Sequence, residues 1–298
     1  MCPGSQSQSP TAGRFFYGWV IALCCTLVTL VNGGIFFSFS VFFKPVASDF
    51  GWSRASFSVS FMAMLVAYAL GAFFTGRLAD RHGPRGTLLG AASLIALGFI
   101  GCSLARDLAS MTLSYAAIGL GTGATLSLPT ATIQRWFVRW RGLMVGIVVA
   151  GTGLGAFIFA PLTDYLIAQY GWRAAYSVIA LVYGGVIAIA ASFLISEPRM
   201  KGLRPFGDGE GQPGKPALRI PKVSPSEFTA AQAFRSGAFW GLAAISVLSF
   251  MPSFFLNAHL VPYATDREIA AADGARAMGM IGLASVAGRL VLTVAAGR

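Results

Sequence analysis

Apolar residues form eight long runs along the chain, and polar and charged residues gather between these runs. Each run is close to the roughly 20 helical residues that cross a hydrocarbon core about 30 Å thick. The pattern therefore predicts eight membrane-spanning helices. They cover residues 17–43, 55–76, 86–105, 108–133, 142–162, 174–195, 237–260 and 278–296.

The composition agrees with this pattern, because 55% of the 298 residues are hydrophobic and only 11% are charged. So little polar surface cannot solvate a water-soluble globule of this size. We expect an all-α polytopic membrane protein whose surroundings are the lipid bilayer.

Basic residues set the expected orientation, since Lys and Arg are retained on the cytoplasmic side. With the N-terminus inside, fifteen Lys and Arg fall in cytoplasmic segments, and six fall in outer loops that also hold six acids. The net charge of +11 is then a topology signal that requires no nucleic-acid partner. We expect a multi-pass protein of the cell (inner or plasma) membrane with a cytoplasmic N-terminus.

Four segments follow from the spacing of the runs. Residues 1–14 form a cytoplasmic tail without a cleavable signal pattern, and residues 15–195 form a six-helix N-terminal half. Residues 196–236 are rich in Pro, Gly and charge, which predicts a cytoplasmic linker that is flexible in its centre. Residues 237–298 begin a second half with two helices.

The two halves carry related motifs. Pro-Val-Ala-Ser-Asp at 45–49 corresponds to Pro-Tyr-Ala-Thr-Asp at 262–266, and Thr-Gly-Arg at 75–77 corresponds to Ala-Gly-Arg at 296–298. Such parallel repeats are typical of transporter halves. We interpret the chain as a fragment of a twelve-span protein that lacks about four later spans.

The loop between the second and third runs reads Gly76-Arg-Leu-Ala-Asp-Arg-His-Gly-Pro-Arg85. It resembles the signature loop of the major facilitator superfamily in its residues, its position and its predicted side. Charge bias alone would account for the arginines, but not for the aspartate and the two glycines. The resemblance implies a major facilitator fold, with eight of twelve helices present, and a loop that gates the cytoplasmic side. The expected gating residues are Gly76, Asp80, Arg81, Gly83 and Arg85.

Two further stretches narrow the resemblance. Residues 136–146 are similar to the segment that opens the fifth span of monocarboxylate transporters, and residues 17–19 and 41–44 are similar to that group and to oxalate:formate antiporters. Several positions depart from those members, including Trp136, Trp140 and Met144. The resemblance therefore does not carry over the identity of the substrate.

Small residues recur in the fourth and fifth runs, where helices in lipid must approach closely to gain packing energy. The expected packing residues are Gly119, Gly123, Gly151, Gly155 and Pro161. They either form surfaces that slide or bend as the halves rock, or serve tight packing only.

Arg289 is the one formally charged residue inside the eight predicted spans. A charge at the centre of a bilayer costs from about 3 to more than 10 kcal/mol, so it usually lines a cavity and meets a partner. We expect Arg289 to bind an anion, with Ser285 on the same helical face. The resemblance implies the same, because these transporters pair an arginine of the eighth span with a substrate carboxylate. The alternative is a side chain that extends to the membrane interface.

Other residues complete the expected binding site. Ser253 and Asn257 share one face of the seventh run, and His259 either carries a proton or lies at the interface. Tyr68 occupies the repeat position of Arg289, and Tyr115 stands where many superfamily members place an arginine, which argues against proton relay there. The predicted substrate-binding set is Arg289, Ser285, Asn257, Ser253, Tyr68, Tyr115 and His259.

The sequence contains no phosphate-binding loop, no catalytic triad and no metal-ligand spacing. We therefore expect no enzyme, no cofactor and no metal. The prediction is a monomeric secondary transporter that moves a small monocarboxylate-like anion by alternating access, coupled to a proton or to exchange. One alternative is an efflux carrier for drugs or hydrophobic compounds, which would call for an Asp or Glu that the predicted spans lack. Another is a transport-inactive fragment or sensor.

Overall fold

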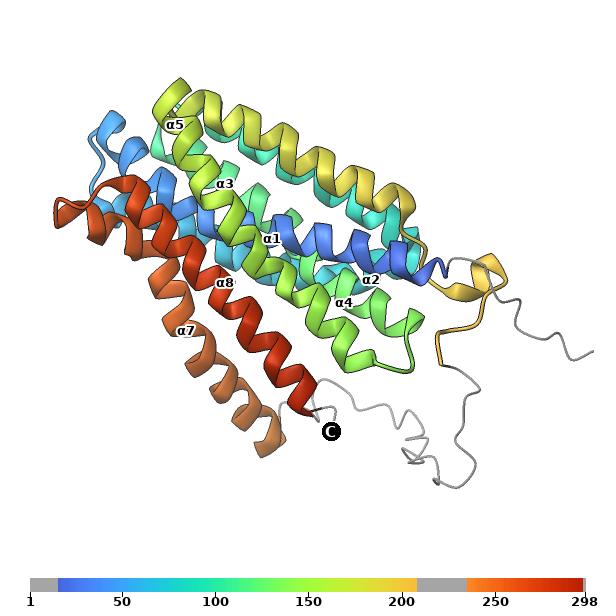
Figure 1. Ribbon diagram of the computed structural model, residues 1–298. Helices are drawn as coiled ribbons and strands as arrows, with labels where there is room; N and C mark the ends of the chain where they lie inside the picture. Colours follow the sequence, from blue (N-terminus) through green and yellow to red (C-terminus); the bar gives the residue numbers. More distant parts are fainter. Residues whose placement is uncertain (1–15, 208–234, 297–298) are drawn as a thin grey trace, which may run out of the picture.

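A computed structural model describes residues 16–207 and 235–296, and within these ranges it is built from helices and contains no extended strand. Figure 1 shows the helices gathered in one bundle, with the last two along one side. The elements are α1 (Gly18–Phe50), α2 (Arg54–Leu104), α3 (Leu108–Thr122), α4 (Ala124–Trp136), α5 (Arg141–Phe193), η1 (Pro198–Lys201), α7 (Gly237–Asp266) and α8 (Ala271–Ala296).

Two of these elements are helical hairpins that each contain two predicted runs. The turn of α2 is at Gly83 (φ 72°, ψ 163°) and the turn of α5 is at Gly171 (φ 77°, ψ 163°). This backbone conformation is open almost only to glycine, so each glycine allows the helix to double back, as Figure 1 shows for α5. By length and hydropathy, α1, α2 and α5 are the described helices that qualify as membrane-crossing. The count of eight spans stays a prediction.

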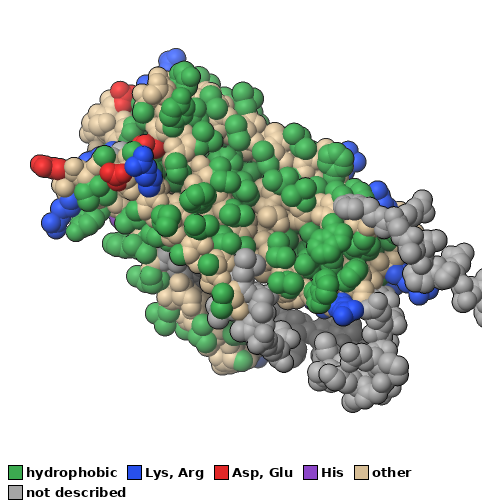
Figure 2. All heavy atoms as spheres, in the orientation of Figure 1, with side chains coloured by type: hydrophobic (Ala, Val, Ile, Leu, Met, Phe, Trp, Pro, Cys, Tyr) green, Lys and Arg blue, Asp and Glu red, His purple; other side chains and the backbone are tan. Residues whose placement is uncertain are grey.

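The surface has the distribution expected of a membrane protein. Figure 2 shows hydrophobic side chains across the middle of the molecule, and charged side chains mostly toward its two ends. Many large apolar side chains are exposed, among them Met62 (64%), Phe73 (67%) and Leu181 (74%). Contiguous apolar surface of this extent needs a partner, and lipid is the partner that surrounds a bundle on all sides.

The first half is held together by buried polar contacts. Asn32 of α1 donates to the hydroxyl of Thr125 in α4 at 2.8 Å. The Ser38 hydroxyl lies 2.9 Å from that of Thr163 and 3.1 Å from that of Tyr183, both in α5. A buried polar group is costly unless it is hydrogen-bonded, so these contacts fix the relative positions of α1, α4 and α5.

Glycine contacts bring helix backbones together within this half. A Cβ atom at Gly119 would overlap the carbonyl of Met64, and one at Gly123 would overlap the backbone of Ala72 in α2. A Cβ atom at Gly155 would overlap the carbonyl of Leu30 in α1.

The same stripe of α5 continues at Gly151, where a Cβ atom would meet the side chain of Thr29. Pro161 lies farther along the same arm of α5, inside the helix. These positions are therefore close backbone contacts between helices, and whether they also slide or bend stays open.

The segment after α5 packs back onto the loop between α4 and α5. The Phe206 amide donates to the Trp136 carbonyl at 2.9 Å, and the Val138 amide donates to the Phe206 carbonyl at 3.0 Å. The Trp136 indole also donates to the Ile195 carbonyl at 3.0 Å. The predicted linker thus begins as structure fixed to the first half. Most of its predicted flexible centre lies outside the described residues.

The last two helices contact the first half, α7 near the turn that joins it to α8, and α8 along α5. Val41 of α1, Ala160 of α5, Val261 of α7 and Ala275 and Met278 of α8 form one apolar cluster. A Cβ atom at Gly282 of α8 would overlap the carbonyl of Gly153 in α5, and the reverse also holds. By contrast, the described large apolar side chains between residues 239 and 256 of α7 are exposed, among them Leu242, Leu248 and Met251. Figure 1 shows α7 running away from the bundle beyond this contact.

We predict that Gly155→Ala lowers the free energy of unfolding by about 1–3 kcal/mol, because its methyl group would overlap the Leu30 carbonyl. Gly185→Ala in the same helix is the matched control, since nothing lies within 4 Å of a Cβ there. The control should be neutral or gain up to about 1 kcal/mol from helix propensity. Thermal unfolding in detergent measures both, and equal midpoints would contradict the packing argument.

Candidate functional site

The predicted site lies around the contact of α8 with α5. Ser285 is half-exposed in α8, one turn beyond Gly282. Because an α-helix turns by about 100° per residue, positions 282, 286 and 289 share one face. The first two meet α5, since Gly282 and Val286 lie against Gly153. The helical register therefore places position 289 on the face of α8 that turns toward the first half.

Three residues of the predicted set have side chains outside the described part of the structure. These are Ser253 and Asn257 of α7 and Arg289 of α8. Their backbone lies in helix, as expected, and their proposed contacts with a substrate stay predictions.

The two tyrosines of the set lie in the first half. Tyr68 of α2 is half-buried, and its ring stands edge-on to Phe36 of α1 at 5.4 Å between centroids. Tyr115 of α3 is buried, and its hydroxyl lies 2.6 Å from that of Tyr176 in α5. Tyr115 therefore has a structural contact within the first half.

His259 is exposed on α7, and its ring centroid lies 5.0 Å from that of Phe255. It is two residues from Val261, which packs in the apolar cluster between the halves. Its position near the end of α7 fits the predicted interfacial location and leaves its role in proton transfer a prediction.

Ser40 of α1 is a residue that the sequence did not single out. Its side chain is 1% exposed, and its hydroxyl is the buried side-chain polar atom without a hydrogen-bond partner in the described part of the chain. Ser40 is adjacent to Val41, which belongs to the apolar cluster between the halves. An unpaired buried hydroxyl calls for an explanation, and one explanation is a partner that arrives in another state. The sequence cannot show whether the hydroxyl of a single serine in an apolar run will have a hydrogen-bond partner.

The predicted gating loop forms the turn of the α2 hairpin. Gly83 supplies the positive φ of that turn, while Gly76, Asp80, Arg81 and Arg85 are exposed. Within residues 16–207 and 235–296, none of the three charged members forms an ion pair. A Cβ atom at Gly76 would meet nothing within 4 Å. The loop is therefore accessible in this arrangement.

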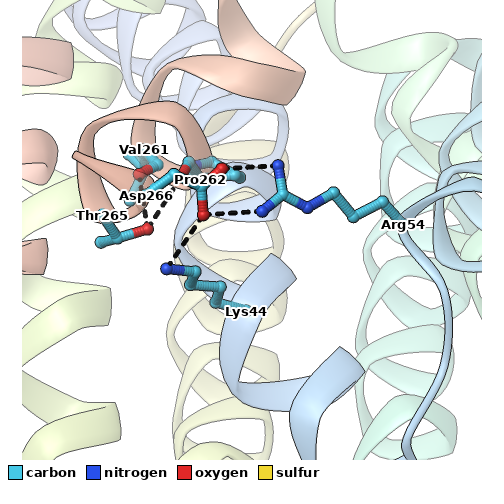
Figure 3. Close-up of polar contacts among 6 residues, drawn as sticks. All are labelled: Lys44, Arg54, Val261, Pro262, Thr265 and Asp266. Atoms are coloured by element: carbon cyan, nitrogen blue, oxygen red, sulfur yellow. Dashed lines mark hydrogen bonds and ion pairs between the residues drawn. The ribbon is translucent and has the colours of Figure 1, made fainter. Parts of the chain in front are cut away.

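An ion-pair cluster joins the two halves at the opposite end of the bundle (Figure 3). Nη2 of Arg54, the first residue of α2, donates to Oδ1 of Asp266 at 2.6 Å, and Nη1 lies 2.6 Å from Oδ2. Nζ of Lys44 in α1 lies 3.3 Å from Oδ1 of the same carboxylate. α7 extends six residues past the predicted end of its span, and Asp266 is its last residue. The sequence placed all three charges in outer loops and did not predict their pairing.

Comparison with curated proteins finds transporters, several of which are named for organic acids. An oxalate:formate antiporter of Oxalobacter formigenes is 26% identical over 89% of this chain and 59% of its own length. Monocarboxylate transporter 11 of Homo sapiens is 26% identical over 92% of this chain and 55% of its own. A gallate transporter of Pseudomonas putida is 31% identical over 58% of this chain and 38% of its own. The chain thus spans about three fifths of these relatives at most.

Solved structures share the fold. A bacterial homologue of the human lysosomal transporter Spinster superposes with a TM-score of 0.69, at 16% identity, over 92% of this chain and 60% of its own. A D-xylose-proton symporter gives 0.68 at 15% identity, over 91% of this chain and 67% of its own.

The family description "Major Facilitator Superfamily" matches residues 25–298, which is nearly the whole chain. The predicted fold class and the resemblance to the monocarboxylate and oxalate group are therefore confirmed. The expectation that the chain is not an enzyme is also confirmed, because the relatives are transporters. The chain is an integral membrane protein that belongs to the major facilitator superfamily.

Proposed function

We propose that the chain belongs to a secondary transporter that moves a small organic anion of monocarboxylate type across the cell membrane by alternating access. The similar oxalate:formate antiporter, monocarboxylate transporters and gallate transporter are all named for carboxylates. A similar riboflavin transporter of Trypanosoma brucei shows that the group also includes a different cargo. The substrate must therefore be argued from this chain's own residues.

Arg289 carries the proposal. It is the one formal charge in the predicted spans, and its helical spacing from Gly282 and Val286, which meet α5, supports a position facing the first half. A guanidinium group offers two parallel donors that match a carboxylate. A charge at this depth is costly unless something opposite pairs with it. An anionic substrate between the halves is the partner that this position favours.

Transport is coupled to a proton or to a counter-anion. The 76–85 loop gates the predicted cytoplasmic side. Its charged side chains are exposed in this arrangement, which fits a gate whose closing contacts are not formed. The protein functions as a monomer in the bilayer, and no cofactor takes part.

We predict that Arg289→Ala lowers uptake of the transported carboxylate at least about tenfold, because the paired charge is lost. Arg289→Lys should keep only part of the activity, since an ammonium group lacks the planar fork. The measurement is uptake of radiolabelled lactate, formate or oxalate by proteoliposomes that contain the full-length protein. Arg276→Ala is the matched control, because Arg276 is an exposed arginine of the same helix, paired with Asp273 three residues away.

Equal uptake by the Arg289→Ala variant and its parent would remove the main support for an anionic substrate. Uptake of riboflavin, with none of the carboxylates, would assign the chain a different cargo class.

We predict that Gly76→Leu slows transport several-fold without lowering the unfolding midpoint. A side chain at Gly76 meets nothing here, so only a state in which the loop closes against a partner would exclude it. Gly90→Leu, on the other arm of α2, is the control, because it has the same open surroundings and lies outside the loop. Initial uptake rates beside thermal unfolding separate the two effects. If both variants transport at the parental rate, the loop does not close tightly at Gly76.

A further inference from the structure

Asp266 is held by two cations that belong to the other half of the molecule. Arg54 begins α2 and contacts the carboxylate of Asp266 through both terminal nitrogens, each at 2.6 Å. Lys44, in the last two turns of α1, approaches the same carboxylate at 3.3 Å. Figure 3 shows the three side chains converging from three helices. The contact therefore connects α7 of the second half to α1 and α2 of the first.

We propose that Asp266 closes the outer entrance between the halves by pairing with Arg54 and Lys44, and that it releases them when substrate enters from outside. This role rests on the proposed alternating access, and it adds three residues to the transport cycle. Asp266 acts as a positioning residue, because it holds the halves together and does not contact the substrate.

The first half provides an internal comparison. Asp49 is the repeat-related aspartate, 217 residues before Asp266. Its Oδ2 accepts from Arg173 Nη1 at 3.0 Å and from the Trp172 indole at 3.2 Å, and both partners lie in α5 of its own half. The repeat thus places an aspartate at the same point of each half. One stabilises its own half, whereas the other reaches across the boundary.

The exposure of the cluster suits a contact that opens. The side chains of Lys44, Arg54 and Asp266 are 46%, 61% and 30% exposed. Exposed ion pairs contribute little to folding, so breaking this one does not endanger the structure. The fork of Arg54 on the carboxylate is nevertheless directional, so it forms in one relative position of the helices. The cluster can therefore select one arrangement of the halves and still release it.

An apolar layer lies directly beneath the ion pairs. Val41 is three residues before Lys44, and Val261 is five residues before Asp266, and both belong to the cluster that joins the halves. Ser40, one turn before Lys44 and next to Val41 in the chain, is buried with its hydroxyl unpaired. If the ion pairs separate and the layer opens, water reaches Ser40 and supplies the missing hydrogen bond. The position of Ser40 is the one expected of a residue that is hydrated in the open state.

The cluster stays charged over the physiological range. The hydrogen bond from Arg54, together with Lys44, lowers the pKa of Asp266. A lowered pKa means that the pairing is complete above the ordinary carboxyl range and is lost only as the pH falls through the lowered value. The other charged or titratable groups at this end are Asp49 with Arg173, Asp273 with Arg276, Arg106, Asp107, Asp164, Arg267 and Glu268, and His259 of α7. The pairing of Asp266 with Arg54 and Lys44 should therefore not change between neutral and mildly acidic pH.

The test measures access to the layer beneath the ion pairs in the full-length protein. Ala160, which is 0% exposed in that layer, is replaced by Cys, and a membrane-impermeant thiol reagent is added from the predicted outer side. The same protein without Ala160→Cys reports any background from the native cysteines. Asp266→Asn should raise the labelling rate at least about fivefold, because the closed arrangement loses its ion pairs. Arg54→Gln should act in the same direction.

Two controls make the result specific. Asp273→Asn removes another exposed acid at the same end, but one that pairs within its own helix, and it should leave the labelling rate unchanged. The triple exchange Asp266→Arg with Arg54→Asp and Lys44→Asp restores opposite charges at all three positions and should return labelling to within about twofold of the parent. Thermal unfolding of each variant shows whether it is folded.

Labelling that is unchanged in both folded Asp266→Asn and Arg54→Gln would overturn the proposal, as would an equal rise in Asp273→Asn. Labelling needs no substrate, so its outcome is independent of which cargo is carried. If Arg289→Ala transports normally while Asp266→Asn still opens the layer, the cargo assignment fails and the outer closure stands.

Discussion

Close approach of helix backbones is the constraint on which this structure depends. Helices in lipid gain no hydrophobic energy from each other, so they associate through dispersion and through polar contacts, both of which need short distances. Gly155 against Leu30 joins α5 to α1, and Gly123 against Ala72 joins α4 to α2. The contact of Gly153 with Gly282 uses the same device between the halves. Contacts inside the first half and contacts between the halves differ in the polar groups that accompany the glycines.

Inside the first half, buried and neutral contacts accompany the glycines, in addition to the exposed ion pair of Asp49 with Arg173. Asn32 with Thr125, and Ser38 with Tyr183, lie in low dielectric surroundings, where an unpaired group would be costly. Rearranging α1 against α4 or α5 would break them without water to replace them. Between the halves, the ion pairs of the described residues are instead those of the exposed Asp266 cluster. The first half is therefore a rigid unit, and its boundary with α7 and α8 is where movement is least opposed.

The sequence predicted the helices and the fold class, but few of the contacts between the helices and loops. Long apolar runs fix the helices, because a backbone in lipid must satisfy its own hydrogen bonds. The turn at Gly83 could be expected from its motif, whereas Gly171 stood in no recognised motif. The docking of residues 195–207 was not foreseen, because Phe206 pairs with Trp136 through backbone atoms that composition does not reveal. Segments rich in Pro, Gly and charge look like linkers whether or not they pack.

The sequence likewise revealed some residues of the candidate site and not others. Arg289 stands out in the sequence because a charge in an apolar run is rare, and that signal is local. Asp266 and Arg54 are separated by 212 residues, and each looks like an ordinary loop charge until the fold brings them together. The repeat did identify Asp49 and Asp266 as related positions. It could not show that one pairs within its half and the other across, because repeats conserve position in each half and the partners come from the packing between them.

The two ends of the described bundle differ in a way that fits one state of a carrier. At the Asp266 end, ion pairs lie over an apolar layer that joins both halves. At the other end, the 76–85 loop is exposed, and α7 leaves the bundle. An exposed pair contributes little to folding, so the apolar layer contributes more to holding the end closed, while the directional ion pairs fix its register. Apolar contact alone would let the helices slide, and ion pairs alone would let water through, so a reversible seal at this end needs both.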